Sequence, residues 1–463
     1  MRIIDHRQFL DKKAKTRHKK LRLVLRGILA IGVAFLLANL VMGLVYINRV
    51  PPNYSLGSVA VGGKTYSSLS KQVTADSLLP KTLTFSKNGS SKQMTPAEVG
   101  LHVDTKASVA ALKHSRPWFP FLSLFMHHTV QLQMSLDNNT FTTATSQLDS
   151  ALSKEPVKNH IEFNGQAFTV VAPKDGYKLD KSALKTELLK AVSSGKANIT
   201  VPVTVQKAAA QADLSASLAA LQKQLATKIS FASQGKTVTP DAKTIGSWYA
   251  ANGQSMALSS DLVGAYLDGI SPSAANRSDL VLAINYALSN YQTFNFAVVP
   301  KGSLTHTYCV QERGASIDPS GIIGKLAATY ADTRGWNNNG TIAFDYASSG
   351  CGYTVWLSSA SQMTSFGAIC DNYYNCEVGT NVILNEDRWN SATAPWNSTG
   401  GSIEDYRILM INHETGHRLG FPDNNVCSGA GQPALVMMQQ SVDLKGCKFN
   451  IWPLPSELAG LGA

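Results

Sequence analysis

The sequence predicts an α+β protein in three parts: one membrane-crossing helix, a series of small α+β modules, and a C-terminal domain with a small mixed sheet and one chemically important helix. Three observations predict this architecture. Residues 27–47 form an uncharged apolar run, a strand–turn–strand pattern recurs between residues 55 and 300, and all six cysteines lie in the last third of the chain. A chain of 463 residues is too long for one ordinary core and has room for two to four domains.

The composition is that of a folded protein, and most of its net charge lies in one short segment. Hydrophobic residues make up 44% of the chain and charged residues 16%. Of the formal net charge of +11, residues 1–26 contribute +8, because ten Lys and Arg residues stand there against two acidic residues; +3 remains for the rest. A polybasic binding arm is one interpretation. The location of the charge favours a basic tail beside a membrane helix, with no nucleic-acid partner.

Residues 27–47 read GILAIGVAFLLANLVMGLVYI, in which Asn39 is the only strongly polar residue. About 20 apolar residues are needed for a helix to cross the hydrocarbon core of a bilayer. A cleaved secretory signal has a shorter apolar region, and Tyr46 stands where an interfacial aromatic residue is expected. The positive-inside rule places residues 1–26 in the cytoplasm. We therefore predict a single-pass type II signal anchor at the cell membrane, with everything after residue 48 outside the cell.

An internal repeat follows the predicted anchor. Its copies begin at Leu83, Ile161 and Ile229, and each predicts a strand, a Gly turn, a second strand and a Pro-marked turn. Apolar residues at helical spacing predict helices over residues 182–192 and 214–225. We assign residues 48–206 to α+β repeats and residues 207–300 to a further repeat-like module.

The repeat pattern F-x-x-x-G … P-x-x-x-G-x-x-[VL]-D resembles the peptidoglycan-binding domain that is found beside vancomycin-resistance W-type and L,D-transpeptidase domains. The resemblance covers about 150 residues and implies contact with the cell wall without naming a contact residue. A plain spacer is the alternative.

Residues 301–463 form the third part, which is richer in Trp, Asn, Gly and Cys. A helix is expected from Asp318-Pro319 to Gly335-Trp336, and strands are expected over residues 307–311, 342–346, 353–357 and 381–384. An even number of cysteines in an extracellular segment predicts disulfides, because no C-x-x-C metal motif is present. Six cysteines allow fifteen connectivities. Our predicted pairs are Cys370–Cys376, Cys427–Cys447 and Cys309–Cys351.

The segment that carries chemistry is the sequence HETGHRLGFPD, residues 413–423. Ser402 and Asp405 predict a capping box that starts a helix ending near Gly420. His413 and His417 are four residues apart, so both imidazoles project from one face and can take two corners of a zinc tetrahedron.

Glu414 lies one position round from His413, where it is placed to act as general base toward a water molecule activated by the metal. Gly420 allows a sharp turn that can return Asp423 as a third ligand. Three protein ligands leave a fourth position open, as catalytic zinc sites require. The alternative is a helix whose two histidines are merely satisfied polar groups, which leaves Glu414 unexplained.

The pattern H-E-x-x-H-x-x-G-x-x-[HD] is that of the metzincin metallopeptidases, and HETGHRLGFPD resembles snapalysin, a small bacterial neutral protease with Asp as third ligand. The resemblance implies a metzincin-like domain in which His413, His417 and Asp423 bind Zn²⁺ and Glu414 is the general base. A methionine turn is also implied, with Met437 and Met438 as candidates. The wider segment resembles an uncharacterised family of bacterial secreted proteins, which more often has His where Asp423 stands.

Two further groups of residues have open interpretations. Arg388 and Trp389 follow the strand 381–384, a predicted sheet edge, and are candidate substrate-binding residues; the alternative is an Arg stacked on a Trp. Cys351 stands in a segment faintly similar to that of L,D-transpeptidases, although no histidine lies between His306 and His413 to activate a thiolate.

The sequence therefore predicts a membrane-anchored, extracellular zinc endopeptidase that acts on a peptide or protein substrate at the cell surface. One alternative is a hydrolase of peptidoglycan peptides. The other is a non-enzymatic wall-binding surface protein with a vestigial metal site.

Overall fold

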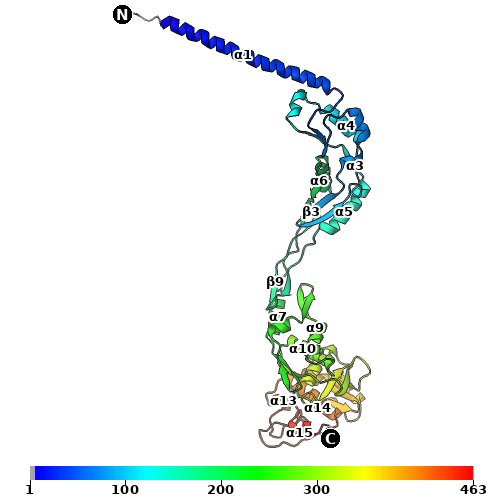
Figure 1. The fold of residues 1–463 in the computed structure, drawn as a ribbon. Coiled ribbons are helices and arrows are strands. Elements are labelled where there is room, and N and C mark those ends of the chain that lie inside the picture. The colour runs from blue at the N-terminus through cyan, green and yellow to red at the C-terminus, as the bar shows by residue number, and fades with distance from the viewer. Residues whose placement is uncertain (1–5, 462–463) are drawn as a thin grey trace, which may run out of the picture. The chain divides into compact units, whose positions relative to one another are not determined.

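A computed structural model describes residues 6–461 and has a mixed α+β architecture with several small sheets (Figure 1). The chain divides into two compact units. Unit 1 runs from the N-terminal helix to Lys158 and includes Pro173–Ala210. Unit 2 combines Asn159–Ala172 with the chain from Gln211 onward, so it contains residues of both the predicted 207–300 module and the predicted 301–463 domain. The predicted α+β class is confirmed.

Helix α1 (His6–Val45) contains the predicted apolar segment. By length and composition, its part Lys19–Val45 is long and apolar enough to cross a membrane, as a membrane anchor or a signal sequence would be. The helix also takes in the predicted basic tail from His6 onward; residues 1–5 of that tail lie outside the described residues.

Unit 1 contains small sheets and several amphipathic helices. Its remaining elements are β1 (Tyr54–Leu56), β2 (Val59–Ala60), α2 (Tyr66–Gln72), α3 (Ala75–Leu78), β3 (Leu83–Lys87), β4 (Ser90–Met94), β5 (Leu101–Val103), α4 (Thr105–His114), the 3₁₀ helix η1 (Pro120–Leu124), β6 (His128–Val130), β7 (Met134–Leu136), α5 (Asn138–Leu152), β10 (Gly176–Leu179), α6 (Lys181–Ser193), β11 (Asn198–Thr200) and β12 (Val203–Gln206). Strand β3 pairs antiparallel with β4 and parallel with β11. The repeat aspartates Asp104 and Asp180 cap α4 and α6, which explains why the pattern ends in Asp.

Unit 2 contains the elements that position the chemistry. They are β8 (His160–Phe163), β9 (Phe168–Val171), α7 (Ser215–Ala226), β13 (Ile229–Ser233), β14 (Lys236–Val238), α8 (Ala242–Gly246), β15 (Tyr249–Asn252), β16 (Ser255–Leu258), α9 (Ser260–Ile270), α10 (Arg277–Ser289), β17 (Phe294–Ala297), β18 (Leu304–Arg313), α11 (Ser320–Ala331), β19 (Ile342–Tyr346), β20 (Tyr353–Ser358), η2 (Ala360–Ser365), β21 (Cys376–Val378), β22 (Asn381–Asn385), α12 (Glu386–Asn390), α13 (Ala394–Ser398), α14 (Ile403–Arg418) and α15 (Pro455–Leu458).

The three repeat copies each form the predicted hairpin, β3–β4, β8–β9 and β13–β14. The second copy is divided: β8–β9 belongs to unit 2, whereas β10 pairs with β12 in unit 1. Ile161 and Phe168 are buried in the same apolar core as Phe231, which explains why the hairpin belongs to unit 2. The ring of Phe163 lies so close to Gly246 that a Cβ there would come within 2.2 Å of it. Gly246, which follows the Pro-marked turn of the third copy, is therefore required for packing.

The sheet that supports the candidate site has five strands in the order β19-β18-β20-β22-β21. Strands β19, β18, β20 and β22 are parallel, and β21 is antiparallel to β22. The segment 381–384 was predicted to be a sheet edge, but β22 is covered by β21 on its outer side. This prediction is wrong because a strand of only three residues, anchored by Cys376, takes the edge.

All three predicted disulfides are present: Cys309–Cys351, Cys370–Cys376 and Cys427–Cys447. Cys351 is disulfide-bonded to Cys309, so it offers no thiolate for catalysis. The second closes the loop that leads into the edge strand β21, and the third ties the segment after Asp423 to the C-terminal part of the chain.

Candidate metal centre

Helix α14 begins and ends as its sequence predicts. The Ser402 hydroxyl accepts from the backbone amide of Asp405, and the Asp405 carboxylate accepts from the amide of Ser402, which completes the capping box. Glu404 and Asp405 stand in the positive first turn of the helix, where negative charge is stabilising. Gly420 follows the last turn with φ +95°, a left-handed conformation that turns the chain back.

One face of α14 is fixed in the core of unit 2. Tyr406 is fully buried, and its hydroxyl is 2.9 Å from the Ser441 hydroxyl, so this tyrosine packs beneath the helix. The indole of Trp336 donates to the backbone carbonyl of Asn412 at 2.7 Å and stacks on Phe421 with ring centroids 4.9 Å apart. These contacts hold the helix and the turn after it in one position.

The structure brings the three predicted ligands together. Nε2 of His413 and Nε2 of His417 lie 3.4 Å and 3.6 Å from the same oxygen, Oδ1 of Asp423. One ligand atom from each residue falls within 4.8 Å of the others. The two imidazole rings are nearly perpendicular, with centroids 4.8 Å apart, so they meet at their edges and do not stack.

The hydrogen bonds of the two imidazoles fix which nitrogen is free. Nδ1 of His413 is 2.9 Å from the Val436 carbonyl oxygen, and Nδ1 of His417 is 2.9 Å from the Phe421 carbonyl oxygen. A carbonyl oxygen can only accept, so each Nδ1 carries the proton and donates it. Each Nε2 is therefore the nitrogen that faces Asp423, and in a neutral imidazole it would carry the lone pair that a metal binds, with Nδ1 held as in metal-binding histidines.

The two distances from the imidazoles to Asp423 fit a zinc ion. Ligands about 2.0–2.1 Å from a tetrahedral zinc are separated from one another by about 3.3–3.4 Å, close to the observed 3.4 Å and 3.6 Å. Two neutral imidazoles and one carboxylate are a donor set that zinc accepts, and they leave one position open. Asp423 also suits the role because hydrogen bonding to His413 lowers the pKa of its carboxyl group.

Glu414 lies in the same cleft and is buried, with 5% of its surface exposed. Burial raises the pKa of Glu414 to about 7, opposed by the nearby His413. No hydrogen-bond partner occupies either oxygen of Glu414 among the described contacts. A carboxylate so placed is free to exchange a proton with a molecule bound in the cleft.

The two candidate methionines of the methionine turn, Met437 and Met438, contact different parts of the site. Met437 is buried against Gly416 in α14, where a Cβ would come 2.2 Å from the Met437 sulfur, so the glycine between the two histidines is needed for close packing. Met438 is also buried and lines the cleft itself. The turn that carries both lies directly under the histidine pair, because the Val436 carbonyl also holds His413.

The cleft has a volume of about 350 Å³ and lies between α14, the edge strand β21 and the methionine turn. Its carboxylates are Asp371, Glu377, Glu414 and Asp423, and its lining contains no Lys or Arg. Burial raises the pKa of Glu377, which stands on β21.

Arg388 and Trp389 are not among the residues that line this cleft. The Arg388 guanidinium lies 4.3 Å from the centre of the Tyr373 ring. Trp389 is buried and is stacked by Arg407, which also donates from Nε to the Trp389 carbonyl. The proposed Arg–Trp stacking exists, but its arginine is Arg407. Both residues come after β22, behind the edge that β21 forms, which explains why they do not reach the cleft.

Sequence reasoning missed two residues that hold the site. The Gln439 side-chain amide donates to Oδ2 of Asp423 at 2.7 Å. The buried Glu457 accepts from the backbone amides of Val436 and Met437 at 3.1 and 2.9 Å, which fixes the methionine turn from below. The helix start at Leu454-Pro455 was the only local signal for Glu457, because its hydrogen bonds cross about 20 residues of chain.

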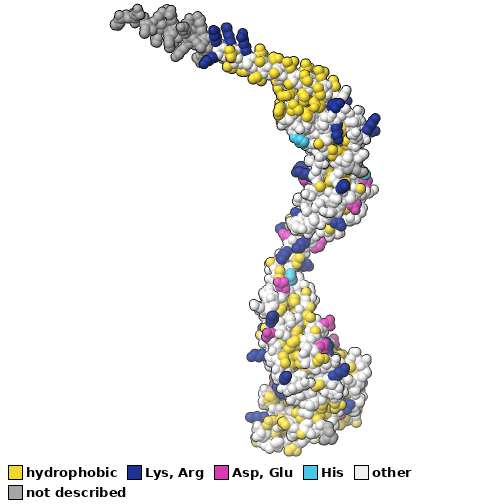
Figure 2. Space-filling model, in the orientation of Figure 1, with side chains coloured by type: hydrophobic (Ala, Val, Ile, Leu, Met, Phe, Trp, Pro, Cys, Tyr) yellow, Lys and Arg dark blue, Asp and Glu magenta, His cyan; other side chains and the backbone are white. Residues whose placement is uncertain are grey.

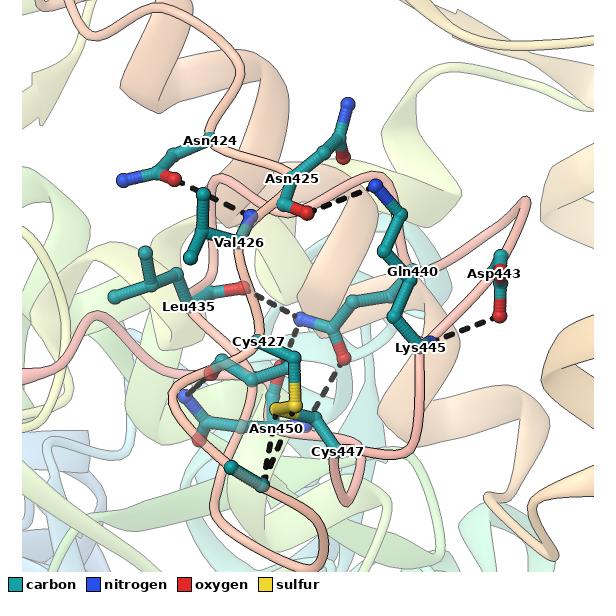
Figure 3. Close-up of a disulfide and its surroundings, with 12 residues drawn as sticks. Asn424, Asn425, Val426, Cys427, Leu435, Gln440, Asp443, Lys445, Cys447 and Asn450 are labelled. Atoms are coloured by element: carbon teal, nitrogen blue, oxygen red, sulfur yellow. Dashed lines mark hydrogen bonds between the residues drawn. A yellow bond between two sulfur atoms is a disulfide. The ribbon is translucent and has the colours of Figure 1, made fainter.

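The loop that follows Asp423 is itself braced (Figure 3). The Cys427–Cys447 disulfide closes it, and the Lys445 ammonium donates to the Asn425 carbonyl at 2.9 Å. Gln440 donates to the carbonyls of Leu435 and Asn450, so its side chain joins the methionine turn to the segment after the disulfide (Figure 3). These contacts restrain the segment that follows Asp423, the candidate third ligand.

Comparison with known proteins gives two family matches. Residues 297–453 match a family described as protein of unknown function (DUF3152), and residues 122–200 match a proposed peptidoglycan-binding domain. No curated protein and no solved structure matches the chain. The predicted resemblance to a peptidoglycan-binding domain is confirmed for residues 122–200, which are part of the predicted range 48–206, and this domain suggests association with the cell wall. The chain thus combines a peptidoglycan-binding domain with a domain of unknown function that contains His413, His417 and Asp423.

Proposed function

We propose that this protein is a membrane-anchored, extracellular zinc endopeptidase that hydrolyses peptide bonds of cell-surface or wall-associated proteins. The observation that carries the proposal is the convergence of His413, His417 and Asp423 on one centre beside Glu414 in a cleft. A structural pair of histidines would need neither the buried free carboxylate of Glu414 nor the two carbonyls that orient the Nε2 lone pairs.

The side chains of this site would have separate roles in amide hydrolysis: three bind the metal, and Glu414 transfers protons. A zinc ion held by the three ligands would supply electrostatic polarisation of a water molecule and of the scissile carbonyl. Glu414 accepts the proton of the attacking water and delivers it to the departing amine. Strand β21 is the edge strand of the sheet, and its residues Cys376 and Glu377 line the cleft. An extended peptide can therefore pair with the free edge of β21 through backbone hydrogen bonds.

The rest of the chain supports a place outside the cell. Residues 27–47 carry no charge, and the basic residues precede this apolar run, which favours a type II anchor with the C-terminal domain outside. Three disulfides fit an oxidising compartment. The peptidoglycan-binding domain would hold the enzyme near wall-associated substrates.

A second candidate function is hydrolysis of peptidoglycan stem or cross-bridge peptides. The match of residues 122–200 to the peptidoglycan-binding domain favours it, because such a domain would bring the cleft to the wall polymer. Release of soluble fragments from purified wall sacculi, compared with cleavage of a casein-type protein, separates the two substrate classes.

The test is a comparison of the full-length protein with Glu414→Gln. We expect the wild type to cleave members of a peptide library and to contain zinc. The variant should keep its zinc and lose activity by about 10²–10⁴-fold, as expected for removal of a general base. A zinc-loaded wild type that cleaves neither peptides nor sacculi would overturn the proposal and favour a non-enzymatic wall-binding protein.

A further inference from the structure

A short apolar loop lies beside the membrane helix in unit 1. Residues 117–126 read PWFPFLSLFM, without a charged residue, and contain the 3₁₀ helix η1. Trp118 is 96% exposed, Phe125 73% and Met126 55%. Figure 2 shows hydrophobic side chains continuing from α1 onto the adjoining part of unit 1. Exposed aromatic residues at this density are unusual for a surface that faces water.

The apolar loop is attached to α1 by specific contacts. The Phe35 ring lies 5.5 Å from the Phe119 ring and 6.0 Å from the Phe121 ring, centroid to centroid. Asn39, the only strongly polar residue of the apolar run, accepts a hydrogen bond from the backbone amide of Phe121 at 3.0 Å. Its side-chain amide donates to the Phe35 carbonyl at 2.8 Å, so both ends of Asn39 are satisfied.

These contacts set the depth of the loop. Asn39 stands eight residues before Ile47, the end of the apolar run. At about 1.5 Å per residue this is about 12 Å along the helix, which lies within one half of a hydrocarbon core about 30 Å thick. If α1 spans the membrane, the segment that contacts Phe35 and Asn39 lies below the surface of the leaflet at the C-terminal end of α1.

Many backbone groups of the apolar loop have hydrogen-bond partners, as a hydrocarbon environment requires of polar groups. Pro117 and Pro120 have no amide hydrogen. The amides of Leu122, Phe125 and Met126 donate to carbonyls inside the loop. The Ser123 hydroxyl donates to the Pro120 carbonyl, and Asn53 donates from its side chain to the Leu124 carbonyl.

The residue before the loop fits the membrane boundary. Arg116 donates from Nη1 to the Ile47 carbonyl at 3.2 Å, which places a cation at the end of the membrane helix. His127 and His128 follow the loop directly. A cation and polar aromatic residues on both sides of an apolar segment are typical of the headgroup region of a bilayer.

We propose that residues Trp118–Met126 insert into the lipid leaflet at the C-terminal end of α1, and that Asn39 holds them against the helix. The occupant of this surface is lipid, because the surface is continuous with that of a helix suited to a bilayer. The loop gives unit 1 a second attachment, so the first module is seated on the membrane and cannot rotate freely about α1. The proposal rests on the membrane anchorage put forward above and is independent of the peptidase activity.

The test uses the full-length protein in lipid nanodiscs, one chain per disc. Every native cysteine is in a disulfide, so Phe125→Cys introduces a single thiol for an environment-sensitive NBD fluorophore. Thr142→Cys, an exposed position on α5 of the same unit, is the matched control. We expect the label at 125 to emit at shorter wavelength and to lose most of its emission with spin-labelled lipids, and the label at 142 to be unaffected. Adding Asn39→Leu to Phe125→Cys should reduce the quenching.

Three other outcomes would contradict the proposal: they concern the environment of the loop, the occupant of the apolar surface and the anchorage of α1. Equal emission from the two labels would place the loop in water. A blue-shifted label at 125 that spin-labelled lipid does not quench would assign the surface to a protein partner or a second copy. Release of the protein from native membranes by alkaline carbonate would show that α1 is no anchor, and this failure is seen before any fluorescence is measured.

Discussion

The side-chain amide of Gln439 donates a 2.7 Å hydrogen bond to Oδ2 of Asp423, while Oδ1 of the same carboxylate faces both imidazoles. One residue of the methionine turn thereby orients the carboxylate that we propose as the third ligand. Asp423 is more exposed than the two histidines and follows a glycine turn, so without this contact its carboxylate would be free to rotate into solvent.

Replacement of Gln439 by Ala should weaken zinc binding. The loss of a hydrogen bond that orients a ligand typically costs about 10–100-fold in metal affinity. Competition titration with a chromophoric chelator measures the Kd, and Gln432→Ala, an exposed position in the same loop, is the control. An unchanged Kd for Gln439→Ala would show that Asp423 needs no support.

Replacement of Glu457 by Ala should destabilise unit 2. The backbone amides of Val436 and Met437 would lose their buried acceptor, at about 1–3 kcal/mol for each unsatisfied group. We expect a lower Tm and faster proteolysis of the methionine turn. Glu155→Ala, at a side chain that is 77% exposed in unit 1, should leave both unchanged. Equal Tm values for the two variants would contradict the assigned role of Glu457.

The buried Asp279 should make stability depend on pH. Burial raises its pKa well above the usual value, with a contribution from Asp345, while Oδ2 has no hydrogen-bond partner among the described residues. Because the folded state holds the proton more tightly, the stabilisation is complete below the unfolded pKa of about 4 and is lost as the pH rises through the folded value. Asp279→Asn replaces this carboxyl group with an amide, which does not titrate.

The difference in unfolding free energy between Asp279→Asn and the wild type, measured by denaturant titration at several pH values, checks this sign. It should shift in favour of the variant as the pH rises from 5 to 8, by up to about 1.4 kcal/mol per pH unit within the window. A free-energy difference independent of pH would show that Asp279 titrates normally in the folded protein.

The cleft should prefer positively charged substrates. Four carboxylates line it without a Lys or Arg, and they outnumber the two positive charges of a bound Zn²⁺, so a lysine side chain or the free amine of a diamino acid would gain electrostatic attraction. A peptide library should yield higher kcat/KM for sequences with a basic residue near the scissile bond. Glu377→Gln should reduce that preference without removing activity, and a preference for acidic peptides would contradict the charge argument.

The local parts of the site could be predicted from sequence, because neighbouring residues determine them. Ser402 and Asp405 cap their own helix, and the spacing of His413 and His417 follows from the helical period. The hairpins of the repeats were predicted for the same reason, since each turn is set by a glycine and the strands on either side of it.

The parts that sequence reasoning missed depend on contacts between distant segments. Gln439 reaches Asp423 across 16 positions, and Glu457 reaches Met437 across 20, so no periodicity marks either residue. Strand β21 has three residues, too few for a pattern, and its pairing with β22 hides the predicted edge. Arg407, not Arg388, stacks on Trp389 because one turn of α14 faces α12.

X-ray absorption at the zinc K-edge of the full-length protein tests the central claim most directly. The account predicts about one zinc per chain, with two imidazole nitrogens and a carboxylate oxygen about 2.0–2.2 Å from the metal. The imidazole signal should weaken in His413→Ala, while Glu414→Gln should keep the wild-type spectrum. A folded wild type that binds no zinc at stoichiometric concentration, or a spectrum without imidazole scattering, would contradict it.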